Sequence, residues 1–260
     1  MVRAARVKGG PGVDRLAPRV PFTFFPFVIP LPRSVNGGIV SHATALQEFN
    51  GLMYVAGNFN SVGAGSCPGA GCVVVNKIAT LDSAYNWGAL PCVAPCVGTG
   101  VGLNNAVNAM AVFNGALWMV GTFTDFGNAA GGAGSGTTAA ASRPYGLVGW
   151  TGSAWLLPGC GTCNSFGSYP KYALAVLGDL LVIGGSFTAA NPQTGTGPNA
   201  NGLITWDGGS KWGVMPTGAT NGIGSGTIFA LAVAGNNLYA GGSFTSLADA
   251  TVANHLAMWR

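Results

Sequence analysis

Charged side chains are scarce in this sequence. They make up 7% of its 260 residues, whereas a typical soluble domain has about 25%. Only seven residues are acidic, and the two histidines are His42 and His255. A Ser-His-Asp hydrolase needs a histidine between a nucleophile and an acid, and most glycosidases need a pair of carboxylates. Neither set is evident, so we expect no catalytic residue, no metal site, no cofactor and no enzymatic activity.

A basic surface is also lacking outside the first twenty residues. The basic residues of that stretch are Arg3, Arg6, Lys8, Arg15 and Arg19, against the single acid Asp14. The rest of the chain then has 11 − 5 = 6 basic and 7 − 1 = 6 acidic residues and is neutral. Because nucleic-acid binding depends on clustered Lys and Arg, we expect no nucleic-acid partner. Residues 1–20 are predicted to be a basic flexible tail, and residues 21–260 the folded region.

The sequence has no uninterrupted apolar run of the length that crosses a membrane as a helix, about 20 residues, so no transmembrane segment is predicted. Residues 20–31 are apolar and follow the basic tail, as in a secretory signal peptide. Three prolines interrupt them, and no small-residue cleavage site is clear. A secretion signal is therefore not clearly visible.

What the sequence does contain is an internal repeat. Four segments align without gaps and end at Phe59, Phe123, Phe187 and Phe244, which are 64, 64 and 57 residues apart. Each segment reads as a strand, a tight turn and a second strand. The turns contain Asn-Gly, Gly-Asp or Gly-Asn, which favour the positive φ angles of hairpin turns.

A second half follows each hairpin, after a glycine-rich loop. It begins with an apolar run, and in the first three units a turn and a short Trp-containing strand come next. Four antiparallel strands per unit, repeated along a chain, are the plan of a β-propeller. We therefore predict an all-β protein, a propeller of four four-stranded blades. The blades span about 42–91, 107–158, 171–216, and 228–260 together with 22–32.

The blade at the end of the sequence takes a strand from the beginning in this prediction. The fourth unit ends at Trp259-Arg260, after its third strand, and FTFFPFVIPLP at 22–32 resembles the missing fourth strand. Such sharing would close the ring and remove the exposed strand edges. The alternative is that the chain is a fragment of a larger propeller.

The repeat has a family resemblance. The clearest motifs are GGSFT at 184–188 and 241–245 and LITWDGGSKW at 203–212. Residues 40–260 resemble the cortical cell-polarity-marker type of propeller repeat, which is similar in style to kelch and galactose-oxidase propellers. The resemblance implies a surface interaction or a structural role and no particular reaction.

Six cysteines occur as three close pairs, which are Cys67/Cys72, Cys92/Cys96 and Cys160/Cys163. An even number in local pairs favours disulfides in an oxidising compartment, although free thiols and a metal site stay open as alternatives. All three pairs lie in loops that the strand alternation places on one face, together with the long loops. This pattern favours an extracellular or cell-surface location.

The face that carries the long loops is the candidate binding surface. Its aromatic residues Phe126, Phe166 and Tyr169 are candidate contacts for a protein or carbohydrate partner, or they hold their own loops in place. The leading hypothesis is a non-catalytic binding module. The alternatives are a structural unit that self-assembles into a larger surface layer or filament and, third, a secreted enzyme.

Overall fold

The computed structural model describes residues 36–39, 41–64, 67, 69–91, 101–128, 145–158, 169–188, 200–217 and 220–260. These residues form antiparallel sheets and contain no helix. The prediction of an all-β chain is confirmed. None of the described segments is a helix long and apolar enough to cross a membrane.

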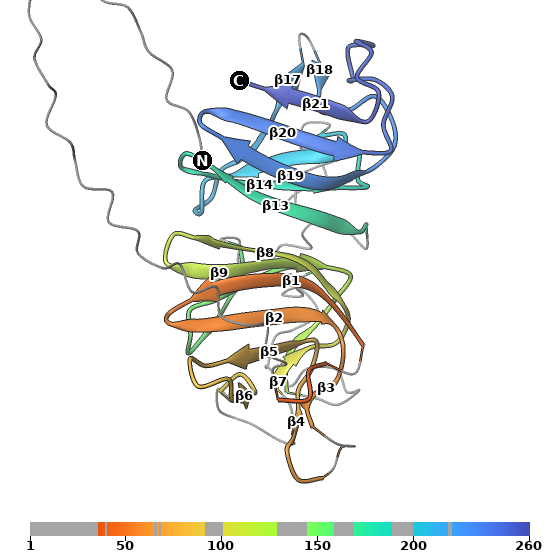
Figure 1. Cartoon of the computed structure of the whole chain (residues 1–260). Coiled ribbons are helices and arrows are strands. Elements are labelled where there is room, and N and C mark those ends of the chain that lie inside the picture. The colour runs from red at the N-terminus through yellow and green to blue at the C-terminus, as the bar shows by residue number, and fades with distance from the viewer. Residues whose placement is uncertain are drawn as a thin grey trace, which may run out of the picture. The chain divides into compact units, whose positions relative to one another are not determined.

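Four sheets follow one another along the chain (Figure 1). Sheet 1 contains, in spatial order, β1 (His42–Phe49), β2 (Leu52–Asn58), β5 (Ile78–Leu81) and β6 (Trp87–Gly88). Sheet 2 contains β8 (Val107–Phe113), β9 (Ala116–Gly121), β11 (Leu147–Trp150) and β12 (Trp155–Leu156). Sheet 3 contains β13 (Lys171–Leu177), β14 (Leu180–Gly185), β15 (Leu203–Trp206) and β16 (Trp212–Val214). Sheet 4 has three strands in the described part of the chain, β19 (Ile228–Ala234), β20 (Asn237–Gly242) and β21 (Leu256–Trp259).

Three short two-stranded ladders accompany these sheets. They pair β3 (Ser61–Gly63) with β4 (Cys72–Val74), β7 (Val101–Leu103) with β10 (Phe126–Asn128), and β17 (Pro216–Thr217) with β18 (Thr220–Asn221).

The hairpin between the first two strands of each sheet forms where the turn residues tolerate positive φ. Asn50 and Gly51 have φ angles of 51° and 77°, and Asn114 and Gly115 have 48° and 73°. These are the left-handed values that a two-residue type I′ turn requires, and Asn and Gly adopt them at the least cost.

The first strand of each sheet also contains a β-bulge, two residues after its start in β1 and one residue after its start in β8, β13 and β19. The bulged residues are Thr44, Asn108, Tyr172 and Phe229. The Thr44 hydroxyl donates to the carbonyl of Val107 in the next sheet, and Asn108 Nδ2 donates to the carbonyl of Lys171 at 2.7 Å. The Tyr172 ring contacts the Phe229 ring with 5.3 Å between centroids. Each sheet is therefore linked to the next through its bulge.

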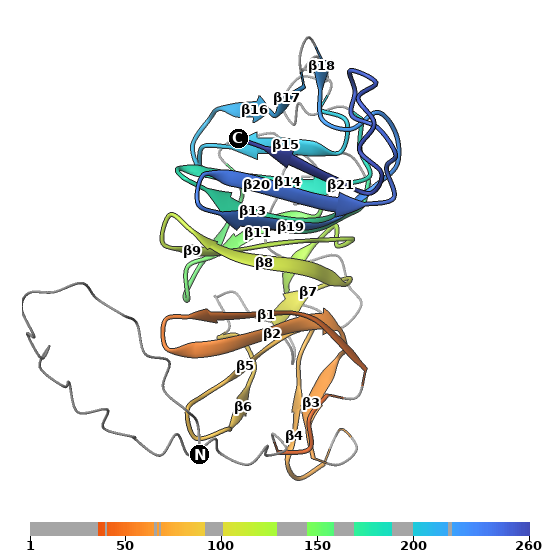
Figure 2. The ribbon, with the colours of Figure 1, turned by 45° about the horizontal axis from the view of Figure 1, so that its top comes forward.

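The first strands consequently lie side by side in the order β1, β8, β13, β19 (Figures 1 and 2). Three apolar cores fill the spaces between consecutive sheets. Large aromatic side chains pack in these cores. Trp118 of sheet 2, for example, packs edge to face against Trp206 of sheet 3, with 4.5 Å between ring centroids. Burying one large apolar side chain stabilises the fold by about 1.5–3 kcal/mol.

The closed ring that the sequence predicts is not found among the described residues. β19 does not pack against β1 as β8 and β13 pack against their neighbours. Leu46 of β1 and Phe229 of β19, at the two ends of the row, are exposed. The strand expected to complete the last blade, residues 22–32, lies outside the described residues.

Candidate functional site

Two of the three predicted contact aromatics belong to the described residues, and the structure gives them different surroundings. Phe126 is half-buried, and its ring packs against Trp155 with 5.5 Å between centroids. Tyr169 precedes β13 and is 56% exposed. Phe166 lies outside the described residues. The position of Phe126 in the repeat is taken by Val62 in sheet 1, and both residues pair with an apolar residue ahead of a first strand. The structure thus gives Phe126 packing contacts, and ligand contact by this residue stays a prediction.

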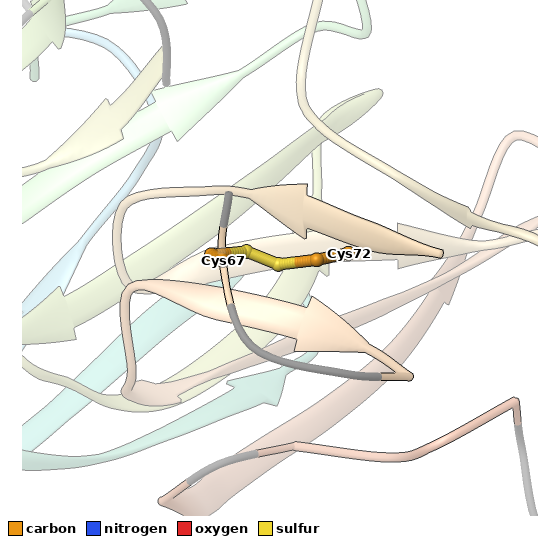
Figure 3. The surroundings of a disulfide bond; sticks show 2 residues. All are labelled: Cys67 and Cys72. Carbon is orange, nitrogen blue, oxygen red and sulfur yellow. A yellow bond between two sulfur atoms is a disulfide. The ribbon is translucent and has the colours of Figure 1, made fainter. Parts of the chain in front are cut away.

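The predicted cysteine pair that belongs to the described residues is a disulfide. Cys67 and Cys72 are bonded, with 5.5 Å between their Cα atoms (Figure 3). The bridge closes the loop between β3 and β4, next to the Gly63–Cys72 pair of that ladder. Cys92, Cys96, Cys160 and Cys163 lie outside the described residues, so the prediction for them stands as made.

One candidate site is a cavity of about 300 Å³ where sheets 3 and 4 meet. Three short backbone segments surround it. They are residues 186–188 after β14, residues 201–202 before β15 and residues 223–226 before β19. Tyr169 completes the lining. The volume of the cavity is at the lower end of the range for small-molecule pockets.

The lining of this cavity is neutral and polar in the part of the chain that the structure describes. Hydroxyl and amide groups come from Ser186, Thr188, Asn201 and Ser225, and apolar surface comes from Phe187 and Ile223. None of these side chains carries a charge. Such a lining suits an uncharged ligand that has several hydroxyl groups, because each lining group can donate or accept a hydrogen bond.

The backbone around the cavity is fixed by hydrogen bonds. Asn201 and Gly202 both have positive φ, 37° and 79°. The amide of Gly202 donates to the carbonyl of Phe187 at 2.6 Å, and the amide of Ile223 donates to the carbonyl of Asn201 at 2.9 Å. Asn201 Nδ2 donates to the carbonyl of Asn221 at 3.1 Å. These bonds hold together the backbone segments before β15, after β14 and before β19 that line the cavity.

A smaller cavity of about 30 Å³ occupies the equivalent position between sheets 2 and 3. Its lining includes Thr122, Thr124, Tyr145 and Lys171, with Tyr169 again contributing. Tyr169 thus lines both cavities and is the exposed aromatic group between them.

Lys171 is the unexpected residue of this region. Its side chain is 1% exposed, and Nζ donates to the carbonyl of Tyr145 at 2.7 Å. Burial lowers the pKa of Lys171 from 10.5 to about 7, because a low-dielectric site disfavours the charged form. Gly146 makes room for the side chain: a Cβ there would lie 3.1 Å from Lys171 Cδ.

Sequence reasoning missed Lys171, although the repeat contains the signal. The structure places Lys171 opposite Gly185, in the register in which Val107 faces Gly121 and Ile228 faces Gly242. Val107 and Ile228 are fully buried. A lysine in an otherwise apolar repeat position departs from what packing alone requires.

The acidic residues at the opposite ends of the sheets belong to turns. Asp82 Oδ1 accepts hydrogen bonds from the amides of Ala84 and Asn86, and Asp207 Oδ1 accepts from those of Gly209 and Lys211. These backbone donors lower the pKa of both carboxyls. Within the described ranges, no three His, Cys, Asp or Glu side chains lie close enough to hold a metal ion.

His42 begins β1, and His255 lies in the turn before β21. The ring of His42 is 3.2 Å from the Ser41 hydroxyl, and the ring of His255 is 3.2 Å from the carbonyl of Gly242. His255 has a φ of 72° and takes the place that Gly202 takes in sheet 3, since both precede the third strand of their sheets. Its contacts are those of a turn residue.

No family model and no curated protein matches the chain. Among solved structures, the crystal structure of the computationally designed Ika8 protein is 12% identical over 84% of this chain and 46% of that chain, with a TM-score of 0.42. The designed Ika4 protein is 15% identical over 88% and 98% of the two chains, with a TM-score of 0.43. YjhT is 18% identical over 76% and 57%, with a TM-score of 0.39. The chain thus spans less than half of the Ika8 chain, and similarity at this level identifies neither a family nor a function.

Proposed function

We propose that this protein is a non-catalytic binding module of the cell surface or extracellular space, and that it binds a neutral carbohydrate in the cavity between sheets 3 and 4. The observation that carries the proposal is the combination of an uncharged, hydrogen-bonding lining with the exposed ring of Tyr169 at the cavity. A tyrosine supplies apolar area and a polar hydroxyl together, and a sugar presents the same two kinds of surface.

The location is supported by the Cys67–Cys72 bridge, because disulfides persist mainly in oxidising compartments. The four sheets, linked through their first strands, are in this proposal blades of an open arc of a propeller. Repetition would then place cavities at the same end of successive blades, and the two cavities that share Tyr169, although of different size, support this arrangement.

Binding to a glycan array, followed by calorimetry with the best ligand, tests this function. We expect Tyr169→Ala to weaken binding at least about tenfold, as truncation of a central aromatic contact does. The matched control is Tyr85→Ala, because Tyr85 is similarly exposed (50%) in the turn between β5 and β6, at the opposite end of its sheet. The proposal is rejected if no glycan binds, or if Tyr169→Ala and Tyr85→Ala bind like the wild type.

A further inference from the structure

Exposed apolar side chains gather on the two terminal sheets. Of the large hydrophobic residues that the structure shows as exposed, only Val112 and Tyr169 belong to the inner sheets 2 and 3 or their approaches. The others belong to sheets 1 and 4 and their loops: Leu46, Met53, Val74, Tyr85, Phe229, Val252, Leu256 and Met258. Contiguous exposed apolar surface marks an interaction site, so the positions of these side chains in the repeat are needed to tell which of them share a face.

Comparison of equivalent positions in the four sheets shows which of these side chains are exposed where their counterparts are buried. The first residue of each third strand faces the following sheet, and it is Ile78, Leu147, Leu203 or Leu256. The first three are 0% exposed, whereas Leu256 is 63% exposed. Sheet 4 thus has an apolar surface of the kind that the other sheets bury against a following sheet.

Sheet 1 also exposes an apolar side chain that the other sheets bury, in this case toward the preceding sheet. One position in each second strand faces the preceding sheet, and it is Met53, Leu117, Leu181 or Leu238. Met53 is 38% exposed, whereas its three equivalents are 0% exposed. Ile78 and Leu117 share the first core, Leu147 and Leu181 the second, and Leu203 and Leu238 the third. The missing fourth pair is Leu256 with Met53.

The remaining apolar cluster is half of such a core. The first three cores each combine residues of two consecutive sheets. The fourth, around Val55, Phe59 and Ala79, is built only from sheet 1 and its own β3–β4 ladder and flanking residues. Phe59 takes the position of Phe123, which packs within the core that sheet 2 shares with the preceding sheet. These residues are already buried within the single chain, so Met53 is the compared position at which this face of sheet 1 is left exposed.

We infer that two copies of this chain associate head to tail, with the outer face of sheet 4 in one copy packing against the outer face of sheet 1 in the other. The interface would be the same one that joins consecutive sheets within the chain. Two copies joined at both ends supply eight sheets, which is within the usual range of four to eight blades in a propeller. This inference is independent of the proposed carbohydrate binding.

Light scattering coupled to size exclusion tests the association on the full chain. We expect the wild type to have twice the mass of a single chain, and Met53→Lys or Leu256→Glu to raise the dissociation constant about tenfold or more. The matched control is Val112→Lys, because Val112 has the same 38% exposure as Met53 but lies in the inner sheet 2. This control should leave the mass unchanged.

Mixing the two variants distinguishes head-to-tail contact from other modes. A mixed pair of Met53→Lys and Leu256→Glu has one wild-type interface and one Lys–Glu interface, so the double mass should return on mixing. Circular dichroism of each variant verifies that its sheets are intact. A wild type of single-chain mass at all concentrations, or variants that do not complement each other, would overturn the inference.

Discussion

At the scale of single residues, Lys171 shows how one substitution in a repeat introduces a property that the repeat lacks. Its neighbours in register are apolar, and its own amine is buried against the carbonyl of Tyr145. A buried lysine is the side chain whose charge state is most sensitive to its surroundings. Near neutral pH this amine is divided between its charged and uncharged forms.

Lys171 predicts a pH dependence of stability. Because the folded pKa is about 7 and the unfolded value is 10.5, the unfolded state binds more protons between these pH values. The free energy of unfolding should therefore rise with pH across this window, by at most about 1.4 kcal/mol per pH unit. Below pH 7 both states are protonated and the contribution is constant.

Denaturant unfolding of wild type and Lys171→Ile at pH 6, 7, 8 and 9 measures this contribution. Isoleucine is the residue that sheet 4 places in the same register, at Ile228. The difference between the two proteins should change steadily above pH 7, whereas the exposed Lys211→Met control should run parallel to the wild type. Parallel curves for all three proteins would show that Lys171 keeps an ordinary pKa.

At the scale of elements, the bulges join one sheet to the next through different chemistry at each step. The link between sheets 2 and 3 can be removed by a single substitution, because it is one hydrogen bond from the partly buried Asn108 amide to the carbonyl of Lys171. We expect Asn108→Ala to lower the free energy of unfolding by about 1 kcal/mol, the usual net value of one intramolecular hydrogen bond. Thermal or urea denaturation would measure it.

The control for this substitution is Asn236→Ala, which changes an exposed asparagine in the turn between β19 and β20. It should alter stability by no more than about 0.5 kcal/mol, as surface changes usually do. Equal losses in Asn108→Ala and Asn236→Ala would mean that the bond between sheets 2 and 3 contributes nothing specific.

The elements were predictable from the sequence wherever local chemistry decides them. Asn50-Gly51 and Asn114-Gly115 predict hairpins, and the alternating apolar residues on either side predict paired strands; both occur. The bulges were not predictable, because the bulged positions hold Thr, Asn, Tyr and Phe, which share no conformational preference. What fixes them is the contact with the next sheet, which no local pattern encodes.

Some features of the candidate site were likewise predictable from the sequence, and others were not. Tyr169 and the Cys67–Cys72 pair stand out in the sequence by residue type and spacing, and the structure places Tyr169 at a cavity and joins the two cysteines. Phe126 is also aromatic, but its ring packs against Trp155 instead of lining the cavity. The lining by Asn201 and Ser225 depends on the approach of two sheets, and therefore only the structure shows it.

At the scale of the whole molecule, the inner sheets differ from the outer ones in that both of their faces are covered. β9 and β14 are central strands of sheets 2 and 3, and their side chains are almost entirely buried. We expect their amides to exchange with deuterium most slowly, because only extensive unfolding exposes them. β1 and β21 should exchange faster in protein diluted until it is a single chain.

Hydrogen exchange followed by mass spectrometry at two protein concentrations checks this order. Peptides from β9 and β14 should be equally protected at both concentrations, whereas those from β1 and β21 should gain protection in the concentrated sample. Uniform protection across the sheets at low concentration would contradict the contrast between covered and uncovered faces.

The uncovered faces at the two ends have a consequence for how such a chain changes length during evolution. A segment such as residues 107–170 carries a complete sheet, with one face that receives its predecessor and one that receives its successor. Duplication or loss of that segment in the gene would leave the first and last faces unaltered. The number of sheets would then change, while the outer faces of the first and last sheets keep the side chains that fit each other.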